Sequence, residues 1–400
     1  MTSPGRVPHR LFTPAFAAVF ASSLVFFTGG GAVLTVSPRF AEGPIGADAL
    51  GFGIAIGIWS FASLAVRPVV GWSADRYGRR PLLVIGATLT VVALAIHLVT
   101  TTLPVFVGAR AILGVAEAAF LVAALAASGD LAPPGRTGEA LSLVSLSLYV
   151  GLVVGPVLGE AVLGAAGYTG VWLLAGGLTA VSAVLAWLVP ETRPPLLPNA
   201  TGTGSGTSRR GRLFHPAGLL PGVLILCGIW GMATFLTFVP LHAARLGLAG
   251  AGPALAVFGV VVIAVRLFGA KLPDRVGGVR LTGVALVFTA TGLVIIGAVG
   301  GLLGLLVGSA VLGVGVAMTM PAVLTLAIGR APATERGSVV GTASLFLDLA
   351  FGFAPVVLAP IAVAAGYPAL FLASAVVALA GLAVLGATRA SLGAVPQPAG

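Results

Sequence analysis

The sequence predicts an all-α polytopic membrane protein with twelve transmembrane helices in two pseudo-symmetric six-helix bundles and both termini in the cytoplasm. Composition, the spacing of hydrophobic runs and the distribution of positive charge support this prediction. Of 400 residues, 58% are hydrophobic and only 8% are charged, whereas soluble domains carry about 25% charged residues. A spanning helix needs about 20 apolar residues, so most of this chain must lie in lipid or pack against other membrane helices.

Hydrophobic runs bounded by Pro, Gly and charged residues mark the predicted helices in order. In the first half they are 11–36, 48–70, 81–101, 104–127, 139–164 and 170–189. In the second half they are 217–241, 252–270, 281–299, 303–328, 337–363 and 368–387. The separations between the third and fourth runs and between the ninth and tenth runs are the shortest. The first run is too long for a signal peptide and has no convincing cleavage site, so it is interpreted as a spanning helix.

Positive charge orients these helices. Only Arg39 and Arg245 fall in predicted outer loops, and Arg67, Arg110 and Arg266 fall inside spans. The other basic residues lie on one side, which the positive-inside rule identifies as the cytoplasm: Arg6, Arg10, Arg76, Arg79, Arg80, Arg136, Arg193, Arg209, Arg210, Arg212, Lys271, Arg275, Arg280, Arg330, Arg336 and Arg389. The net charge of +10 therefore indicates topology in a multi-pass plasma-membrane protein and no nucleic-acid partner.

One long segment separates the halves. Residues 190–216 are rich in Pro, Gly, Ser, Thr and Arg, a composition typical of a flexible linker. The predicted domains are thus an N-terminal bundle at 1–189, a cytoplasmic linker at 190–216, and a C-terminal bundle with a short cytoplasmic tail at 217–400.

The two halves carry an internal repeat at an offset of 199 residues. Pro156 corresponds to Pro355 in the fifth helix of each half. After the second helix of each half, Arg67, Gly71, Asp75, Arg76 and Gly78 correspond to Arg266, Ala270, Asp274, Arg275 and Gly277. The repeat indicates duplication of a six-helix unit, with the substrate path expected between the halves.

Three of these segments resemble motifs of the major facilitator superfamily, and of its 12-helix drug/proton antiporter branch. Gly71-x-x-x-Asp75-Arg76-x-Gly78-Arg79-Arg80 resembles the signature loop between the second and third helices. The run from Gly151 to Glu160 resembles the antiporter motif of the fifth helix, and Arg110-x-x-x-Gly114 resembles a fourth-helix motif more loosely. Span count, linker and repeat extend the resemblance over the whole chain.

The resemblance implies that the signature loop is a gating latch. In the family its Asp engages the start of the eleventh helix in the outward-facing state, which here places Asp75 opposite the region near Gly337. A carboxylate is favoured at a positive helix N-terminus. The second gating loop, with Asp274, Arg275 and Gly277, would act in the same way near residues 137–139. The alternative is that these charges only enforce topology.

The resemblance also associates the fifth-helix motif with exporters that exchange substrate for protons. Gly151, Gly155 and Gly159 share one helix face, which lets a neighbouring backbone approach closely, and Pro156 bends the helix. The family motif commonly ends in a second glycine, whereas this sequence has Glu160. The alternative interpretation is small-residue packing with no role in coupling.

Ionisable residues inside spans mark transport pathways because burying them is costly. Glu117 lies near the middle of the fourth predicted helix and Asp348 near the middle of the eleventh, while Arg110 precedes Glu117 by two helical turns on the same face. We hypothesise that Glu117 and Asp348 face a central cavity and that one or both exchange protons. Static ion pairs that hold helices together are the alternative.

These observations favour a secondary transporter for proton-coupled efflux of a small amphipathic compound or metabolite. The alternative is a proton-coupled importer of a small polar solute such as a sugar or organic acid. The only lysine, Lys271, lies outside any P-loop motif, and the four histidines are scattered, so neither ATP-driven pumping nor an enzyme is expected.

The expected partners are a small-molecule substrate, protons and the lipid bilayer. We expect a monomer with no cofactor and no metal. One departure from the drug branch is that the first predicted helix contains no acidic residue. Several aromatic residues could line a cavity or serve ordinary packing: Phe26, Phe27, Trp59, Trp230, Phe235 and Phe238.

Overall fold

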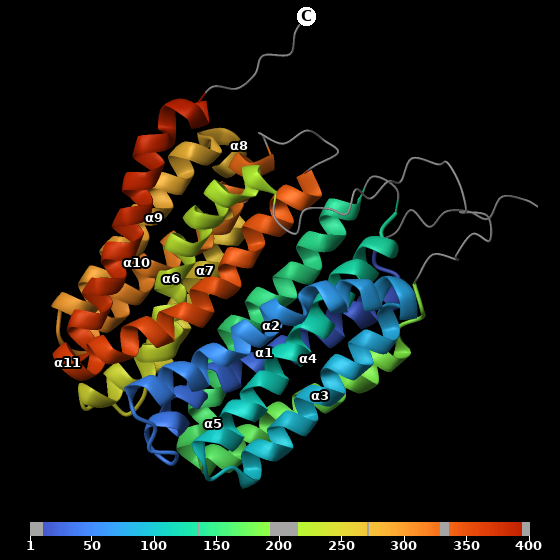
Figure 1. The fold of residues 1–400 in the computed structure, drawn as a ribbon, viewed down its shortest axis with the longest axis horizontal. Helices are drawn as coiled ribbons and strands as arrows, with labels where there is room; N and C mark the ends of the chain where they lie inside the picture. Colours follow the sequence, from blue (N-terminus) through green and yellow to red (C-terminus); the bar gives the residue numbers. More distant parts are fainter. Residues whose placement is uncertain (1–10, 134–135, 193–214, 270–271, 329–335, 394–400) are drawn as a thin grey trace, which may run out of the picture. The chain divides into compact units, whose positions relative to one another are not determined.

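The computed structural model describes residues 11–133, 136–192, 215–269, 272–328 and 336–393, and every element in these ranges is an α-helix. Figure 1 shows the long helices running side by side within each part of the chain. The helices are α1 (Pro14–Glu42), α2 (Ala49–Tyr77), α3 (Arg79–Val99), α4 (Leu103–Asp130), α5 (Thr137–Leu188), α6 (Pro216–Arg245), α7 (Gly252–Phe268), α8 (Leu272–Val276), α9 (Gly278–Ala298), α10 (Gly301–Ile328) and α11 (Arg336–Gly393).

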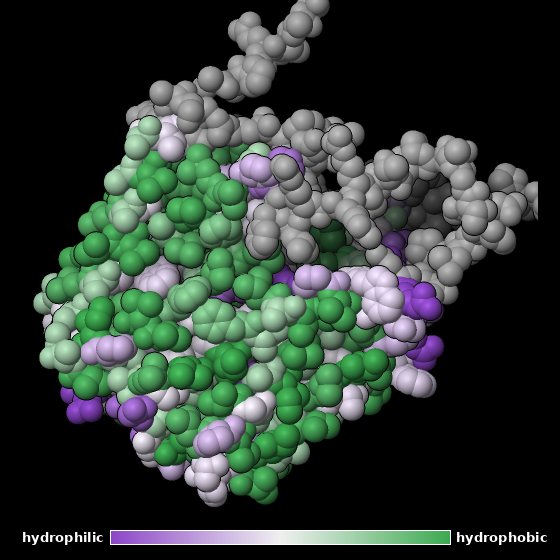
Figure 2. Space-filling view, in the orientation of Figure 1, coloured by the Kyte–Doolittle hydropathy of each residue, from purple (hydrophilic) through white to green (hydrophobic). Residues whose placement is uncertain are grey.

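The helices are built for a bilayer. Within the described residues, nine are long and apolar enough to cross a membrane, and α7 is a shorter apolar helix. Large hydrophobic side chains that are exposed along them include Val69, Leu173, Val260, Leu303 and Val376. Figure 2 shows hydrophobic residues covering the sides of the helices, with hydrophilic residues gathered near helix ends. The chain is therefore a multi-span membrane protein.

Two predicted loops are absent. The gap predicted between runs 139–164 and 170–189 lies inside α5, and the gap between runs 337–363 and 368–387 lies inside α11. Each of these elements is two helices joined at a kink, at Gly167 (φ 66°) in α5 and at Gly366 (φ 81°) in α11. Glycine adopts positive φ at little cost, so one residue can redirect the chain where a loop was expected. The two glycines are again 199 residues apart.

The two shortest connections predicted between helices are present in the structure. Helix α3 ends at Val99 and α4 begins at Leu103, while α9 ends at Ala298 and α10 begins at Gly301. Helices α1 and α6 extend beyond the prediction at their C-terminal ends, because α1 continues to Glu42 and α6 to Arg245. Arg39 and Arg245, expected in outer loops, therefore lie in the last turns of helices.

The chain forms two compact units. Unit 1 comprises Met1–Val36 and Phe61–Gly204, and unit 2 comprises Ser37–Ser60 and Ser205–Gly400. The boundary between the units thus falls inside α1 and inside α2. The predicted bundles, 1–189 and 217–400, instead keep both helices whole. Most of the predicted linker, 193–214, lies outside the described residues.

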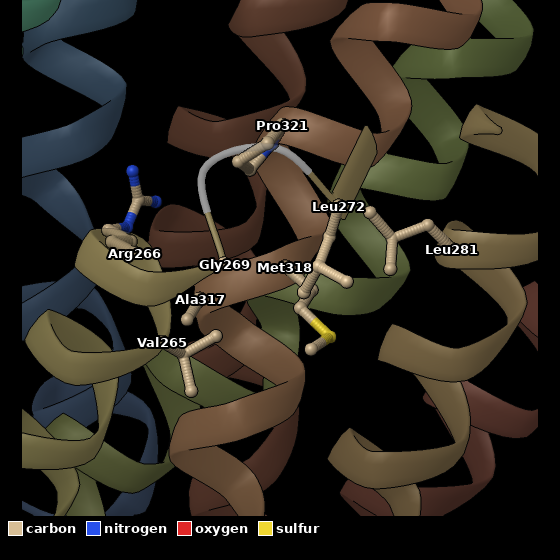
Figure 3. A pocket seen from close by; sticks show the side chains of 8 residues that line it. All are labelled: Val265, Arg266, Gly269, Leu272, Leu281, Ala317, Met318 and Pro321. Atoms are coloured by element: carbon tan, nitrogen blue, oxygen red, sulfur yellow. The ribbon is translucent and has the colours of Figure 1, made fainter. Parts of the chain in front are cut away.

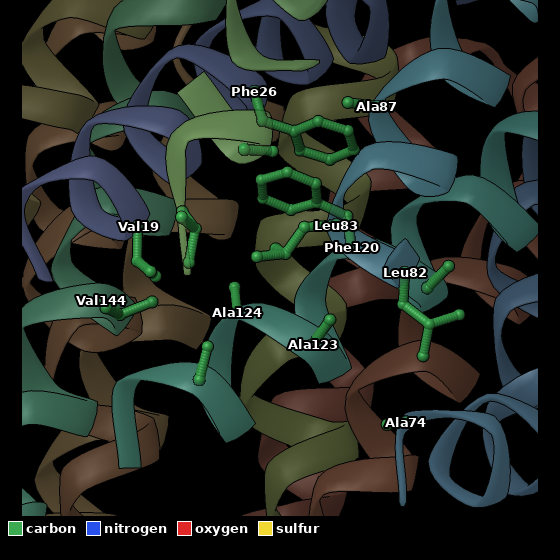
Figure 4. Close-up of a cluster of buried hydrophobic side chains, with 14 of the residues drawn as sticks. Val19, Phe26, Ala74, Leu82, Leu83, Ala87, Phe120, Ala123, Ala124 and Val144 are labelled. Carbon is green, nitrogen blue, oxygen red and sulfur yellow. The ribbon is translucent and has the colours of Figure 1, made fainter. Parts of the chain in front are cut away.

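The core of unit 1 is a layer of alanines and aromatic rings. Helix α4 contributes buried small residues such as Ala123 and Ala124, which let neighbouring helices approach. Phe26 of α1 stacks on Phe120 of α4 with ring centroids 3.9 Å apart, at the centre of the cluster in Figure 4. Phe27 also contacts Phe120 edge to face. Both phenylalanines, considered above as cavity residues, therefore serve packing here.

Unit 2 is organised around α6, which is buried along nearly its whole length. Phe235 packs on Phe258 of α7. The hydroxyl groups of Thr234 and Ser374 are 2.8 Å apart and form a hydrogen bond between α6 and α11. Hydroxyl pairs of this kind link helices where no water is available.

Candidate functional site

The predicted signature loop between the second and third helices is almost entirely helical. Gly71, Asp75 and Arg76 belong to α2, Arg79 and Arg80 open α3, and only Gly78 lies between them. The prediction of a loop was wrong because Gly78, with φ 106°, makes the whole connection. The Asp75 side chain lies outside the described residues, so its predicted latch to the start of the eleventh helix remains a proposal.

A carboxylate from a distant segment caps the start of α3. Gly78 has no side chain with which to cap this helix, and Glu191 accepts the backbone N–H groups of Arg79 and Arg80 at 2.9 and 3.3 Å. A carboxylate in this position satisfies unpaired N–H groups and complements the positive helix end. A Cβ at Gly78 would collide with the Glu191 carboxylate. Glycine is thus required at position 78 both for its φ and for the space that Glu191 occupies.

Arg79 ties three helices together at the same junction. Its Nε lies 2.9 Å from Asp130 Oδ2 at the end of α4, and one Nη donates to the carbonyl oxygen of Ala74 in α2. The Thr192 hydroxyl donates to the same Asp130 oxygen at 3.1 Å. The ends of α2, α3 and α4 and the segment after α5 therefore share one network.

Sequence reasoning did not identify Glu191, Thr192 or Asp130 as part of this junction. Glu191 lies 112 residues from Arg79, and no motif spacing connects them. The available signal was topological: both acidic residues follow the ends of predicted spans on the side where the third span was predicted to begin.

The other two arginines of the motif, Arg76 and Arg80, contact aromatic rings. The Arg76 guanidinium lies 5.7 Å from the Trp72 ring centre and 5.8 Å from that of Tyr77, and Arg80 lies 4.6 Å from Trp187. All three rings are more than half exposed. Exposed aromatic and basic residues at helix ends are typical of the membrane–water interface.

The second gating segment is also not a simple loop. Asp274 and Arg275 lie in the short helix α8, and Gly277 (φ 84°) connects it to α9, as Gly78 connects α2 to α3. The Asp274 side chain lies outside the described residues. A cavity of about 220 Å³ lies beside this segment, lined mainly by apolar residues including Val265, Leu272, Leu281 and Met318, with Arg266 on one side (Figure 3).

The glycines of the fifth-helix motif form a seam against α1. A Cβ at Gly151 would lie 2.5 Å from the backbone of Phe27, and one at Gly159 would lie 2.9 Å from the carbonyl oxygen of Ala32. A Cβ at Gly155 would collide with the carbonyl oxygen of Thr28. Pro156 packs against Gly31 from the same side. The predicted close approach of a neighbouring backbone is therefore present, and the neighbour is α1.

The ionisable residues inside the helices lie in different units. Arg110 of α4 is fully buried and Glu117 of the same helix is partly exposed, both in unit 1. Asp348 of α11 is 5% exposed and belongs to unit 2. The cavity that Glu117 and Asp348 were predicted to share remains a proposal.

His97 is a packed residue of unit 1. One ring nitrogen lies 2.7 Å from the carbonyl oxygen of Ala93, and the ring contacts Phe106 and Trp172. In the part of the chain that the structure covers, no group of three His, Cys, Asp or Glu side chains is placed to hold a metal ion. Cys227 is a buried free cysteine.

Comparison with known proteins identifies relatives along the whole chain. The family model described as Major Facilitator Superfamily matches residues 18–355 and 251–398. An uncharacterized MFS-type transporter of Salmonella typhimurium is 30% identical over 393 residues, covering 96% of this chain and 98% of the relative.

Two solved structures share the fold at lower identity. The inward-facing, unoccupied structure of a bacterial homolog to the human lysosomal transporter Spinster matches with a TM-score of 0.79 at 14% identity, covering 96% of this chain and 98% of that one. The human organic anion transporter MFSD10 matches with a TM-score of 0.66 at 20% identity, covering 93% and 99%.

Proposed function

The chain belongs to the Major Facilitator Superfamily, and on this premise we propose that it is a secondary active transporter that works by alternating access. We propose proton-coupled efflux of a small amphipathic organic compound or metabolite across the plasma membrane. The observation that supports efflux as the direction of transport is the glycine seam between α5 and α1. This seam is formed by the residues of the antiporter motif.

The proposed architecture has twelve spanning helices. Eight helices count once: α1, α2, α3, α4, α6, α7, α9 and α10. Helices α5 and α11 count twice because each is two helices joined at a glycine kink. An even number of spans agrees with the proposal that both termini are cytoplasmic, with bundles at 1–189 and 217–400 joined by the 190–216 linker. We propose that the monomer is the working unit.

Proton exchange is assigned to the carboxylates inside the spans. Burial of a charged side chain in a membrane is costly and usually marks a pathway, and Asp348 is almost completely buried. Glu117 would act from unit 1 and Asp348 from unit 2, with the buried Arg110 supplying positive charge to the substrate path. The segments around Asp75 and Asp274 would act as gating latches during alternation.

Transport into inverted membrane vesicles tests this function. A panel of dyes, antibiotics and sugars is supplied outside the vesicles while internal pH is recorded. We expect an amphipathic substrate to enter as protons leave. Substrate movement without proton movement would remove proton exchange from the proposal. Movement of a sugar and protons in the same direction would favour a symporter of polar solutes.

Neutral variants of the two carboxylates test the proposed proton sites in the same vesicles. Glu117→Gln and Asp348→Asn keep side-chain volume but cannot gain or lose a proton at neutral pH. We expect at least one of them to abolish proton movement coupled to substrate. Asp48→Asn is the matched control because Asp48 caps α2 through the N–H of Gly51 and lies at a helix end. Full coupling in both test variants would contradict this assignment.

A further inference from the structure

We propose that five residues hold the transporter closed at the end of the molecule where α1 ends and α2 begins. We propose that these contacts open once in each transport cycle. This outer lock consists of Arg39 and Glu42 of α1, Pro240 and Arg245 of α6, and Tyr367 of α11. The proposal rests on the alternating access proposed above, and it adds residues at which one of the two states is held.

The contacts of the outer lock join the end of α1 to two other helices. Arg39 Nη2 donates to the carbonyl oxygen of Pro240 at 3.0 Å. Glu42 Oε1 lies 3.7 Å from Arg245 Nη2, and the Tyr367 hydroxyl donates to the Glu42 carboxylate with both oxygens at 3.4 Å. All five residues lie in unit 2. The last turn of α1 is thus held by α6 and α11.

The same end of α2 fits tightly against α11. A Cβ at Gly53 would lie 2.7 Å from Cα of Val356, and a Cβ at Gly57 would collide with the carbonyl oxygen of Gly352. Phe52 packs on Phe238 of α6 with ring centroids 5.6 Å apart. This contact leaves no room for side chains at Gly53 and Gly57, so it forms only when α2 lies flush on α11.

The boundary between the two compact units falls where α1 can bend. The part of α1 from Ser37 onward belongs to unit 2. The next residue, Pro38, has no backbone N–H, so one hydrogen bond of the helix is missing there. The segment Ser37–Ser60 therefore belongs to unit 2 through the outer lock and the α2–α11 contact. Release of those contacts would free this segment to move with the rest of α1 and α2 in unit 1.

The charges of the outer lock suit a contact that is made and broken repeatedly. The Arg245 side chain is 73% exposed and that of Glu42 is 40% exposed, and exposed ion pairs contribute little net stability. Arg39 and Arg245 are also the basic residues that lie on the side where positive charge is disfavoured. A role in holding the closed state explains their presence there.

Labelling of one buried cysteine measures opening without any substrate. The reporter is Phe52→Cys with Cys227→Ala, because Phe52 is only 5% exposed and lies inside the closed contact. The purified protein in detergent is treated with a water-soluble maleimide, which reaches the reporter only when this end opens. The test changes are Arg39→Gln, Glu42→Gln and Gly57→Ala, each added to the reporter protein.

We expect the labelling rate to rise about two- to fivefold for each polar change, because loss of one exposed or partly buried polar contact shifts an equilibrium by a modest factor. Gly57→Ala should raise it further, since its clash involves backbone atoms. The exchanged pair Glu42→Arg with Arg245→Glu should return the rate toward that of the reporter protein. Asp48→Asn and Gly108→Ala are the matched controls, because Asp48 bonds locally and a Cβ at Gly108 meets nothing within 4 Å.

Unchanged labelling in Arg39→Gln and Glu42→Gln would overturn the outer lock, as would an equal rise in the controls. Both polar changes are at partly or fully exposed positions, so they keep the test decisive even if Gly57→Ala fails to fold. The labelling rates could respond as expected while the vesicle assay shows no proton-coupled transport. That result would support the outer lock and contradict only the proposed proton coupling.

Discussion

At the scale of single residues, Glu191 shows how one side chain organises the junction between α2 and α3. It supplies to α3 the cap that Gly78 cannot, while Arg79 uses its side chain to reach Asp130 and Ala74. The backbone and the side chain of Arg79 therefore contact different segments. Removal of Glu191 should loosen the start of α3 without changing any residue of the motif.

We expect Glu191→Ala to lower the free energy of unfolding of the purified protein by about 1 kcal/mol, the usual cost of losing a helix cap. Glu191→Gln should cost less because its side-chain oxygen can still accept a hydrogen bond, although the charge at the helix end is lost. Unfolding in detergent, followed by circular dichroism, measures both. Equal stability of the wild type and both variants would show that the cap contributes nothing.

Residue types predicted the location of this junction but not its partners. Gly78 and the following arginines mark a sharp connection between two helices through composition alone. Glu191 was not recognisable because a carboxylate just after a span has no distinctive spacing, and its contact is made only when α3 and α5 pack together. For the same reason, Arg39 and Arg245 were assigned to predicted loops.

At the scale of elements, glycine seams determine which helices come into contact. Gly155 in α5 leaves no space for a side chain beside Thr28 and Gly31 of α1. Gly164 lies in the same element, and a Cβ there would meet nothing within 4 Å. A side chain is therefore excluded at Gly155 but has space at Gly164, although both glycines lie in α5.

We expect Gly155→Ala to destabilise the protein by about 1–3 kcal/mol, the usual cost of overpacking a tight contact. Gly164→Ala should be neutral or stabilising by up to about 1 kcal/mol, because alanine favours helix over glycine. Thermal unfolding of the two variants side by side gives the comparison. A seam without importance for packing would leave Gly155→Ala as stable as Gly164→Ala.

Hydrophobic runs predicted most helices to within a few residues, because lipid requires long apolar segments. They failed at the connections within α5 and α11, where a loop was expected and one glycine makes the turn. They also ended α1, α2 and α6 too early, because the last turns of these three helices carry polar side chains.

At the scale of the whole molecule, the repeat extends beyond the residues from which it was inferred. The offset of 199 that relates Pro156 to Pro355 also relates Gly167 to Gly366, and both kink glycines have positive φ. Each is followed by a tyrosine, Tyr168 and Tyr367. The repeat therefore preserves backbone turns as well as the charges of the two gating segments. By contrast, the positions that correspond to Glu42 and Asp348 in the other half are Leu241 and Tyr149.

The central claim, that this chain alone couples a proton gradient to transport, is tested most directly in liposomes that contain only the purified protein. A substrate identified in the vesicle panel is supplied with an imposed pH gradient and no nucleotide. The account predicts accumulation of substrate above its external concentration, and loss of that accumulation when a protonophore dissipates the gradient. Equilibration without accumulation, or accumulation that the protonophore leaves unchanged, would contradict it.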